Sequence, residues 1–208
     1  MSTFAELKTY VARRLLDPNN TAISSADVGS SINDAIRYWK YREFWFNTSV
    51  NTGTLTLQDG TITLPNDFLV PATNSGAFHI EYSSQRYPLC KVDSEGYNNM
   101  WRGNGYGLPK YYALVGGSYE VYPLPDRAYT ILTSYLKDYT DLSSDGDTND
   151  FTIYAPRLIS LWALANLIAE LRQDEKMETY FRQACMDEYR QLTVMTDKSE
   201  ASGSLTIY

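Results

Sequence analysis

The chain contains one histidine, His79. It lies two residues before Glu81 in an alternating run typical of a β-strand. A histidine near a carboxylate can act as a general base, but no nucleophile motif accompanies this one. Zinc sites need several thiol or imidazole ligands, and the two cysteines, Cys90 and Cys185, lie in different parts of the chain. We interpret His79 as an ordinary hydrogen-bonded strand residue, with catalysis as the alternative. Cys185 is expected to be a small buried residue of a helix.

An acidic run, DLSSDGDTND at residues 141–150, is the strongest candidate for a metal site. Asp141, Ser143, Asp145 and Gly146 match the opening of a helix–loop–helix calcium loop. The twelfth position of such a loop requires a bidentate glutamate, and here it is Thr152. We therefore interpret the run as an acidic turn that leads into a helix, with calcium at residues 141–147 as an open alternative.

A glycine-rich run, GNGYG at residues 103–107, resembles a phosphate-binding loop only in composition. Neither Lys-Ser nor Lys-Thr follows it, and a strand is expected next, whereas phosphate loops lead into a helix N-terminus. We expect a flexible loop there. Paired carboxylates can hydrolyse glycosidic bonds at defined separations, which a sequence does not give. The sequence thus predicts no catalytic residue, no cofactor and no metal, and hence a protein that is not an enzyme.

Composition sets broad limits on function. The 208 residues carry a net charge of −7, which disfavours a general nucleic-acid binder, because such proteins hold phosphates with clustered Lys and Arg. The N-terminus lacks the apolar run of a signal peptide and no stretch is long enough to span a membrane, so we expect synthesis in the cytoplasm and no membrane partner. Tyrosine combines contact area with a polar hydroxyl, so the 18 tyrosines suit hydrated protein interfaces or glycan binding.

Two amphipathic helices are predicted near the N-terminus. The first covers about residues 4–16 and starts at a capping box made by Thr3 and Glu6. The second starts at Ser24 or Ser25 and continues to about Trp45. Their apolar stripes at helical spacing are Phe4, Leu7, Val11 and Leu15 in the first, and Val28, Ile32, Ala35, Ile36 and Trp39 in the second. The second helix is expected to end in five aromatics that anchor it to the next segment: Trp39, Tyr41, Phe44, Trp45 and Phe46.

From Thr48 the apolar residues alternate, which predicts strands. A hairpin is predicted between residues 54–57 and 61–64, with Asp59-Gly60 as its turn. Gly116-Gly117 is expected to form a second hairpin turn. The remaining predicted elements of this region are strands at residues 78–82, 87–91, 111–115, 119–122 and 129–137 and a short helix at residues 94–101.

Helical spacing returns near Ala155, with Pro156 in the first turn. The stripe of this third long helix is Leu158, Leu161, Trp162, Ala165 and Ala169. Asp174 can cap a last helix, for which the residues expected to face inward are Met177, Tyr180, Phe181, Ala184, Tyr189 and Leu192.

The order of these elements predicts an α+β fold. An antiparallel helical bundle is expected from both chain ends, residues 1–47 and 151–197, because pairing them buries four apolar stripes at once. An antiparallel β-rich domain, residues 48–150, is inserted between them. Residues 198–208 are serine-rich and predict a flexible C-terminal tail.

Several runs occur in a fixed order along the chain. They are YREFWF, TLTLQDGTITLPNDFL, GLPKYYAL, a Gly-Gly turn, YEVYPLPDRAYTILTSYLKDY and DLSSDGDTNDF, followed by the two closing helices. This order resembles the head–tail adaptor, or connector, proteins of tailed bacteriophages, particularly those of short-tailed phages. The resemblance extends over about residues 3–192.

The resemblance implies a structural protein of the virion neck that is made in the host cytoplasm. It implies a ring, commonly twelve-fold, that docks beneath the portal protein, attaches tail or nozzle proteins, and continues the channel through which double-stranded DNA leaves without specific binding. In such proteins the C-terminal segment often reaches the portal. Here that segment is Leu205, Thr206, Ile207 and Tyr208, an uncharged, β-prone run suited to pairing with the edge of a partner's sheet. Disorder of this tail is the alternative.

Two other functions stay open at this point. One is a carbohydrate-binding or cell-wall-degrading tail component, supported by the many tyrosines. The other is an unrelated cytoplasmic scaffold.

Overall fold

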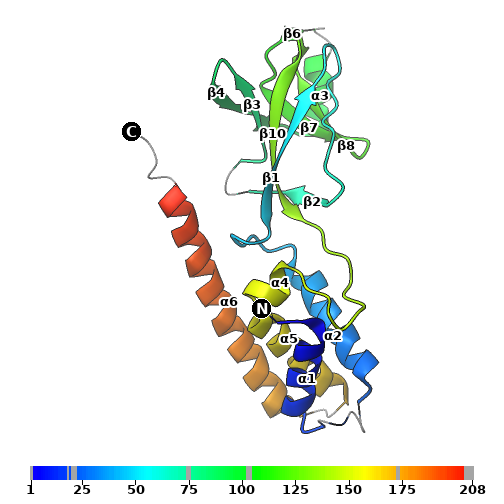
Figure 1. Ribbon diagram of the computed structural model, residues 1–208. Coiled ribbons are helices and arrows are strands. Elements are labelled where there is room, and N and C mark those ends of the chain that lie inside the picture. Colours follow the sequence, from blue (N-terminus) through cyan, green and yellow to red (C-terminus); the bar gives the residue numbers. More distant parts are fainter. Residues whose placement is uncertain are drawn as a thin grey trace. The chain divides into compact units, whose positions relative to one another are not determined.

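The structure is a computed structural model that describes residues 2–17, 19, 23–73, 76–101, 105–171 and 174–203 (Figure 1). By its contacts the chain divides into two compact units. The helical unit consists of Met1–Asn47 and Asp138–Tyr208, and the insert of Thr48–Lys137. Helices at both ends and a β-rich middle confirm the predicted α+β class.

The first helix, α1 (Phe4–Arg14), begins at the predicted capping box. The backbone N–H of Glu6 donates to Thr3 Oγ1 at 3.3 Å, and the N–H of Thr3 donates to Glu6 Oε2 at 3.1 Å. All four residues of its predicted apolar stripe are buried. The predicted start of α1 and its predicted buried face are therefore both confirmed.

The second helix, α2 (Ser25–Trp39), starts where expected, with Ser24 as its N-cap, but the predicted end near Trp45 is wrong. The chain forms a turn there instead, and the side chain of buried Asn47 stabilises this turn. That side chain accepts a hydrogen bond from Phe44 N–H at 2.8 Å and donates one to the carbonyl of Arg42 at 2.8 Å. An asparagine side chain that bonds nearby backbone competes with helix propagation, so α2 ends at Trp39, the first of the five aromatics.

Two of the aromatic residues that follow α2 belong to the core of the helical unit. Phe44 and Phe46 are buried and stack on each other with ring centroids 5.1 Å apart. Both meet Phe151 edge-to-face, at 6.1 Å and 5.3 Å respectively. Phe151 lies in the short helix α4 (Asp150–Tyr154), so the aromatics join the two ends of the chain.

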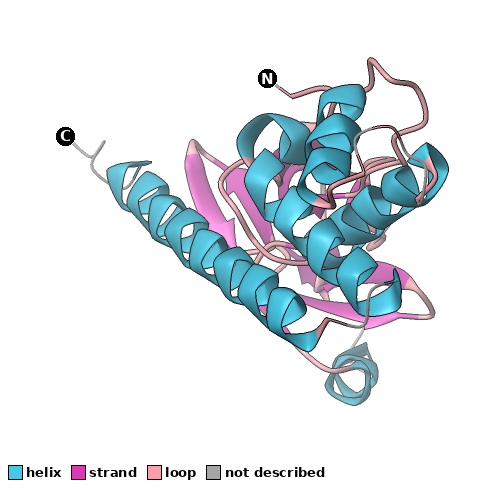
Figure 2. Ribbon diagram, turned by 90° about the horizontal axis from the view of Figure 1, so that it is seen from below, coloured by secondary structure: helices cyan, strands magenta, loops and turns pink. Residues whose placement is uncertain are grey.

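The central helix of this unit is α5 (Pro156–Leu171), which is apolar on nearly every side. It contacts α1, α2, α4 and α6. Figure 2 draws the helices of the chain in cyan. A helix without a polar face is typical of a buried core position, and here it lets four neighbours share one core.

The last helix, α6 (Glu175–Gly203), packs on α5. Asp174 caps it, since its Oδ1 accepts hydrogen bonds from the N–H groups of Lys176 and Met177. The prediction that Tyr180 faces inward is wrong, because its side chain is 68% exposed, while its neighbour Phe181 occupies the core position. The helix continues through Gly203, five residues past the position where the tail was expected to begin.

The main sheet of the insert is built around β10 (Tyr129–Lys137). The long strand β1 (Thr48–Leu55) pairs with one side of β10. On the other side lie β2 (Phe68–Pro71) and β3 (Phe78–Tyr82), and β4 (Gln85–Pro88) pairs with β3. All of these pairings are antiparallel.

A second sheet contains β5 (Cys90–Lys91), β7 (Tyr111–Val115) and β8 (Ser118–Tyr122), and the helix α3 (Ser94–Trp101) lies beside it. The hairpin β7–β8 turns at Gly116 and Gly117 as predicted, and both glycines have positive φ, 57° and 89°. Two short strands, β6 (Tyr106–Gly107) and β9 (Leu124–Pro125), pair in parallel. Side chains of both larger sheets share one apolar core, which includes Leu55, Phe78, Ile80, Tyr112, Val121 and Ile131.

The hairpin predicted across Asp59-Gly60 is wrong. Leu55 pairs with Tyr129 of β10, whereas Ile62 donates its N–H to the carbonyl of Tyr119 at 2.8 Å. The two runs therefore join different sheets. Alternation shows which face of a strand is buried but not which strand is its neighbour, so both runs matched the pattern while their pairing did not.

Candidate interaction surfaces

The acidic turn, together with residues 138–140 before it, packs on the helical unit, whereas the insert was predicted to extend to residue 150. Asp145 and Asp147 accept hydrogen bonds at their backbone carbonyls from the N–H groups of Ala5 and Phe4, both at 3.0 Å. The first N–H groups of a helix have no partner within it, so the turn supplies partners that α1 lacks. Negative charge is also favourable beside the N-terminus of a helix.

The carboxylates of this turn bind protein groups in different directions. Asp145 pairs with Lys8 at 2.6 Å, and Asp141 pairs with Arg37. Asp147 accepts from the N–H groups of Ser143 and Ser144 at 2.8 Å and 2.7 Å. Among the described residues no group of three or more metal-binding side chains comes together. The turn thus has a structural explanation, and the calcium alternative gains no support from its geometry.

A cavity of about 440 Å³ lies beside the turn and is lined in part by Asp138, Asp141 and Asp147. The hydrogen bond from Lys40 lowers the pKa of Asp138, and the backbone N–H groups of Ser144 and Ser143 lower the pKa of Asp147. A glycosidase needs one carboxyl whose pKa is raised, so that it carries a proton at neutral pH. Asp138 and Asp147 have the opposite shift and are unsuited to the role of proton donor.

His79 lies in β3, opposite Leu132 of β10 and Pro88 of β4. Burial lowers the pKa of its imidazole, and the positive charge of Arg86 lowers it further. A neutral, partly buried imidazole in the middle of a sheet agrees with the interpretation of His79 as a strand residue.

The remaining candidates from the sequence are the glycine-rich run, Cys185 and the C-terminal segment, and the structure describes only part of them. Residues 103 and 104 of the glycine-rich run lie outside the described residues, while Tyr106 and Gly107 form β6. Cys185 is fully buried, as predicted, and its thiol donates to the carbonyl of Leu158 at 3.6 Å. Leu205, Thr206, Ile207 and Tyr208 all lie outside the described residues.

The helical unit carries a surface cluster that we call the aromatic ladder: Tyr38 of α2, Trp162 of α5 and Arg182 of α6. Tyr38 stacks on Trp162 with ring centroids 4.2 Å apart and an interplanar angle of 19°. The guanidinium of Arg182 lies 5.3 Å from the centre of the Trp162 ring. Buried Trp39 meets both rings edge-to-face at 5.2 Å and 5.5 Å, which fixes their positions.

The composition of the ladder is that of a protein interface. Trp, Tyr and Arg are the residue types that contribute most to binding energy at such interfaces. Tyr38 is 48% exposed although its ring is held rigidly by stacking, so little conformational entropy is lost when a partner covers it. This cluster was not predicted, because Tyr38 lies beside the apolar stripe of its helix and no local sequence pattern connects it to Trp162.

A second surface of the helical unit is a groove between α1 and α5. It has a volume of about 340 Å³ and is lined by Ser2, Glu6, Leu7, Tyr10, Pro156, Arg157 and Ser160. Arg157 pairs with Glu188 of α6 at 3.3 Å, and Arg14 lies over the ring of Tyr10. The groove therefore combines apolar side chains with charged groups.

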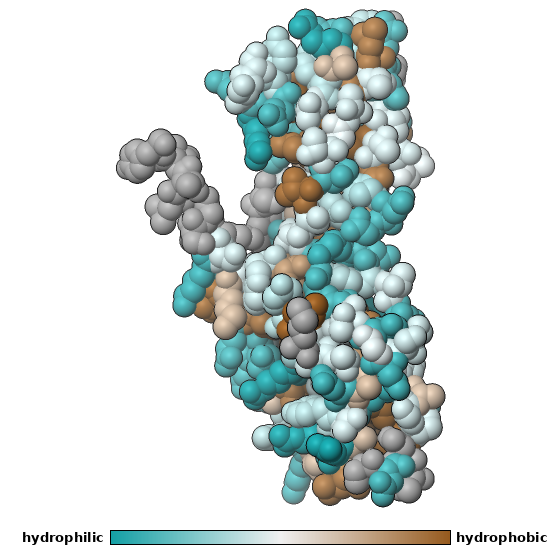
Figure 3. Space-filling view, in the orientation of Figure 1, coloured by the Kyte–Doolittle hydropathy of each residue, from teal (hydrophilic) through white to brown (hydrophobic). Residues whose placement is uncertain are grey.

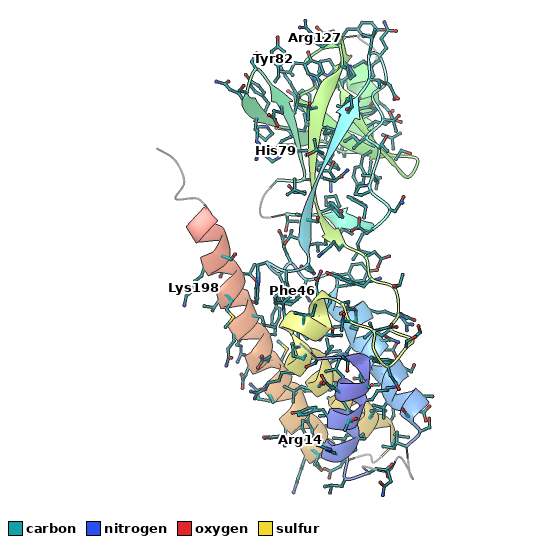
Figure 4. The ribbon with its side chains drawn as sticks, in the orientation of Figure 1. Arg14, Phe46, His79, Tyr82, Arg127 and Lys198 are labelled. Atoms are coloured by element: carbon teal, nitrogen blue, oxygen red, sulfur yellow. The ribbon has the colours of Figure 1, made fainter. Side chains whose placement is uncertain are left out.

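The insert carries its own aromatic cluster, around Tyr82 and Arg127 (Figure 4). Tyr82 meets Tyr129 edge-to-face at 5.7 Å, and the guanidinium of Arg127 lies 5.8 Å from the Tyr82 ring. Tyr129 donates to Asp126 Oδ1 at 2.6 Å. Burial and this bond raise the pKa of Tyr129 to about 12, so its hydroxyl stays protonated and acts as a donor, not a base.

On the face shown in Figure 3, apolar residues are scattered among polar ones over both units. No described helix is long and apolar enough to span a membrane. These surfaces suit contacts with other proteins better than a reaction, because they combine aromatic rings with ion-paired side chains and not with a reactive constellation.

Comparison with known families agrees with this description. The chain matches the SU10 adaptor protein family over residues 2–207. The protein belongs to this family. The match confirms the resemblance to head–tail adaptors drawn from the sequence, and it supports a bacteriophage adaptor that is a structural protein of the virion neck. No curated protein matches the adaptor significantly.

Proposed function

We propose that this adaptor joins the head of a tailed bacteriophage to its tail by forming a ring beneath the portal. The observation that carries the proposal is the family match over residues 2–207, nearly the whole chain. In this proposal the ring attaches tail or nozzle proteins and continues the DNA channel, and the protein has no enzymatic role.

The ring is proposed to close through the helical unit. A closed ring is built from head-to-tail contacts, which need two different complementary surfaces on each subunit. The aromatic ladder and the groove between α1 and α5 are two such surfaces, since one presents stacked aromatic rings and the other is hollow. We propose that the ladder of one copy enters the groove of the next, and that twelve copies close the ring.

Portal attachment is assigned in this proposal to Leu205, Thr206, Ile207 and Tyr208. These residues are uncharged and rich in β-branched and aromatic types, which suits pairing with a strand of the portal. Double-stranded DNA passes without specific binding, because a net charge of −7 on each subunit disfavours adhesion to phosphates.

The experiment is to mix purified adaptor with its portal and to image the particles by electron microscopy. We expect one ring of adaptor density on one end of the portal. A truncation that removes residues 204–208 is expected to leave the adaptor folded and to lose this ring. Portal particles without added density after mixing with the full-length protein would contradict the proposal. Hydrolysis of purified peptidoglycan would support the cell-wall alternative instead.

A further inference from the structure

The strand β1 forms one edge of the main sheet of the insert. In the order β1–β10–β3–β4 it is the terminal strand, with no other described strand paired on its outer side. It is eight residues long, Thr48–Leu55, and its sequence TSVNTGTL contains no charged residue and no proline. Its third residue, Val50, is 64% exposed.

The pairing of β10 shows which backbone groups of β1 point outward. Ser134 uses both of its backbone groups on the side of β10 away from β1, since its N–H donates to the carbonyl of Ala77 at 2.8 Å and its carbonyl accepts from Ala72 at 2.9 Å. Ser134 lies opposite Val50. In an antiparallel ladder this pair is therefore not hydrogen-bonded, and both backbone groups of Val50 point away from β10.

The same direction holds for every second residue of β1. Val50, Thr52 and Thr54 present their N–H and carbonyl groups along the outer edge, and their side chains are exposed. Asn51 and Gly53 direct their backbone groups into the ladder with β10 instead. The outer edge is thus a regular row of donors and acceptors beside β-branched side chains.

The other edge of the same sheet is protected. It is formed by β4, a strand of four residues that contains Arg86 and ends at Pro88. Short length, charge and proline are the means by which proteins prevent an edge from pairing. β4 has these protective features and β1 lacks them. This difference indicates that a partner covers β1 in the assembled state.

We propose that the outer edge of β1 binds an extended, uncharged segment of another neck protein as an added antiparallel or parallel strand. Only an extended backbone supplies alternating donors and acceptors at the spacing of Val50, Thr52 and Thr54. The sheet of a second adaptor copy does not fit. Its β4 edge is blocked by Arg86 and Pro88, and pairing of two β1 strands is two-fold and does not continue around a ring.

This inference rests on the proposed role in the neck, and hydrogen exchange tests the two separately. In the isolated adaptor the amides of Val50, Thr52 and Thr54 are expected to exchange rapidly, while those of Asn51 and Gly53 are protected by the ladder. In necks purified from virions the three outer amides are expected to be protected on the order of 100-fold more. Necks that contain the adaptor with these amides unprotected overturn the edge pairing alone. Absence of the adaptor from purified necks overturns both proposals.

A matched pair of variants tests the same edge without exchange data. Thr52→Pro removes one outward N–H and leaves the ladder with β10 intact, because proline is tolerated on an edge. Thr52→Val keeps the N–H and the β-branched shape. We expect equal thermal stability for the two variants and about tenfold less assembly into necks for Thr52→Pro only. Equal assembly of the two variants into necks contradicts the proposal.

Photo-crosslinking from position 50 identifies the occupant. With benzoylphenylalanine in place of Val50, the crosslink in assembled necks is expected to join the adaptor to a different neck protein. A crosslink to a second adaptor copy overturns the assignment of the partner.

Discussion

Asn33 of α2 makes a reciprocal pair of hydrogen bonds with the backbone of Leu142. Its Nδ2 donates to the carbonyl of Leu142 at 3.0 Å, and its Oδ1 accepts from the N–H of Leu142 at 3.0 Å. Asn33 is buried, so these bonds replace water for both partners. The pair attaches the segment that returns from the insert to a helix more than a hundred residues earlier in the chain.

Replacement of Asn33 by leucine is expected to destabilise the protein by about 1–3 kcal/mol, because both backbone groups of Leu142 lose their buried partner. Urea unfolding followed by circular dichroism measures the effect. Asn98→Ala, at an exposed position of α3, is the control and is expected to change stability by less than about 0.5 kcal/mol. Equal effects of the two changes would show that the Asn33 pair contributes nothing.

The two cysteines are expected to differ in reactivity. Cys90 is exposed, whereas Cys185 is fully buried between α6 and α5, and burial raises the pKa of its thiol to about 12. Since the thiolate is the reactive form, Ellman's reagent at pH 8 is expected to titrate one thiol in the native protein and two in guanidinium. Cys90→Ser is expected to leave none reactive in the native state. Rapid reaction of Cys185 without denaturant would contradict the packing of α6 on α5.

Acid is expected to weaken the attachment of the acidic turn. The folded-state pKa values of Asp138 and Asp147 lie below the ordinary value of 3.8, owing to Lys40 and to the N–H groups of Ser144 and Ser143. Groups with a lowered folded-state pKa stabilise the protein fully above their unfolded value, and this contribution is lost as the pH falls through the folded value. The free energy of unfolding should therefore decline below about pH 5.

The double variant Asp138→Asn and Asp147→Asn tests this dependence. It is expected to be less stable than the parent at pH 7 and to lose less stability between pH 5 and pH 3, because neither amide titrates. Denaturant titrations at several pH values give both quantities. Parallel curves for parent and variant would refute the assignment.

The aromatic ladder gives a prediction for assembly. Tyr38→Ala removes the outer ring of the stack and is expected to abolish ring formation on the portal, while stability falls by no more than about 1.5 kcal/mol. Tyr38→Phe retains the ring and is expected to assemble. Sedimentation of adaptor–portal mixtures measures both. A Tyr38→Ala variant that still forms complete rings would remove the ladder from the interface.

Local sequence signals predicted much of the fold. Apolar spacing located all four long helices, and the capping box at Thr3 and Glu6 placed the start of α1 at the observed residue. The paired glycines Gly116 and Gly117 placed the β7–β8 hairpin, because few other residues adopt positive φ. These features depend on neighbours in the chain, which is why the sequence alone reveals them.

Features that depend on distant contacts were not predictable in this way. The end of α2 is set by the side chain of Asn47, and the partner of β1 is β10, about eighty residues later. The stack of Tyr38 on Trp162 also joins separate helices. Exposure of Tyr180 was missed because Phe181, at the next position, fits the same helical stripe and occupies the core.

Native mass spectrometry of the adaptor bound to its purified portal tests the central claim most directly. A ring bound to the portal predicts a single complex whose mass exceeds that of the portal by a full ring of 208-residue subunits, commonly twelve, without partly filled intermediates at saturation. A portal mass that stays unchanged at adaptor concentrations well above that of the portal would contradict the account.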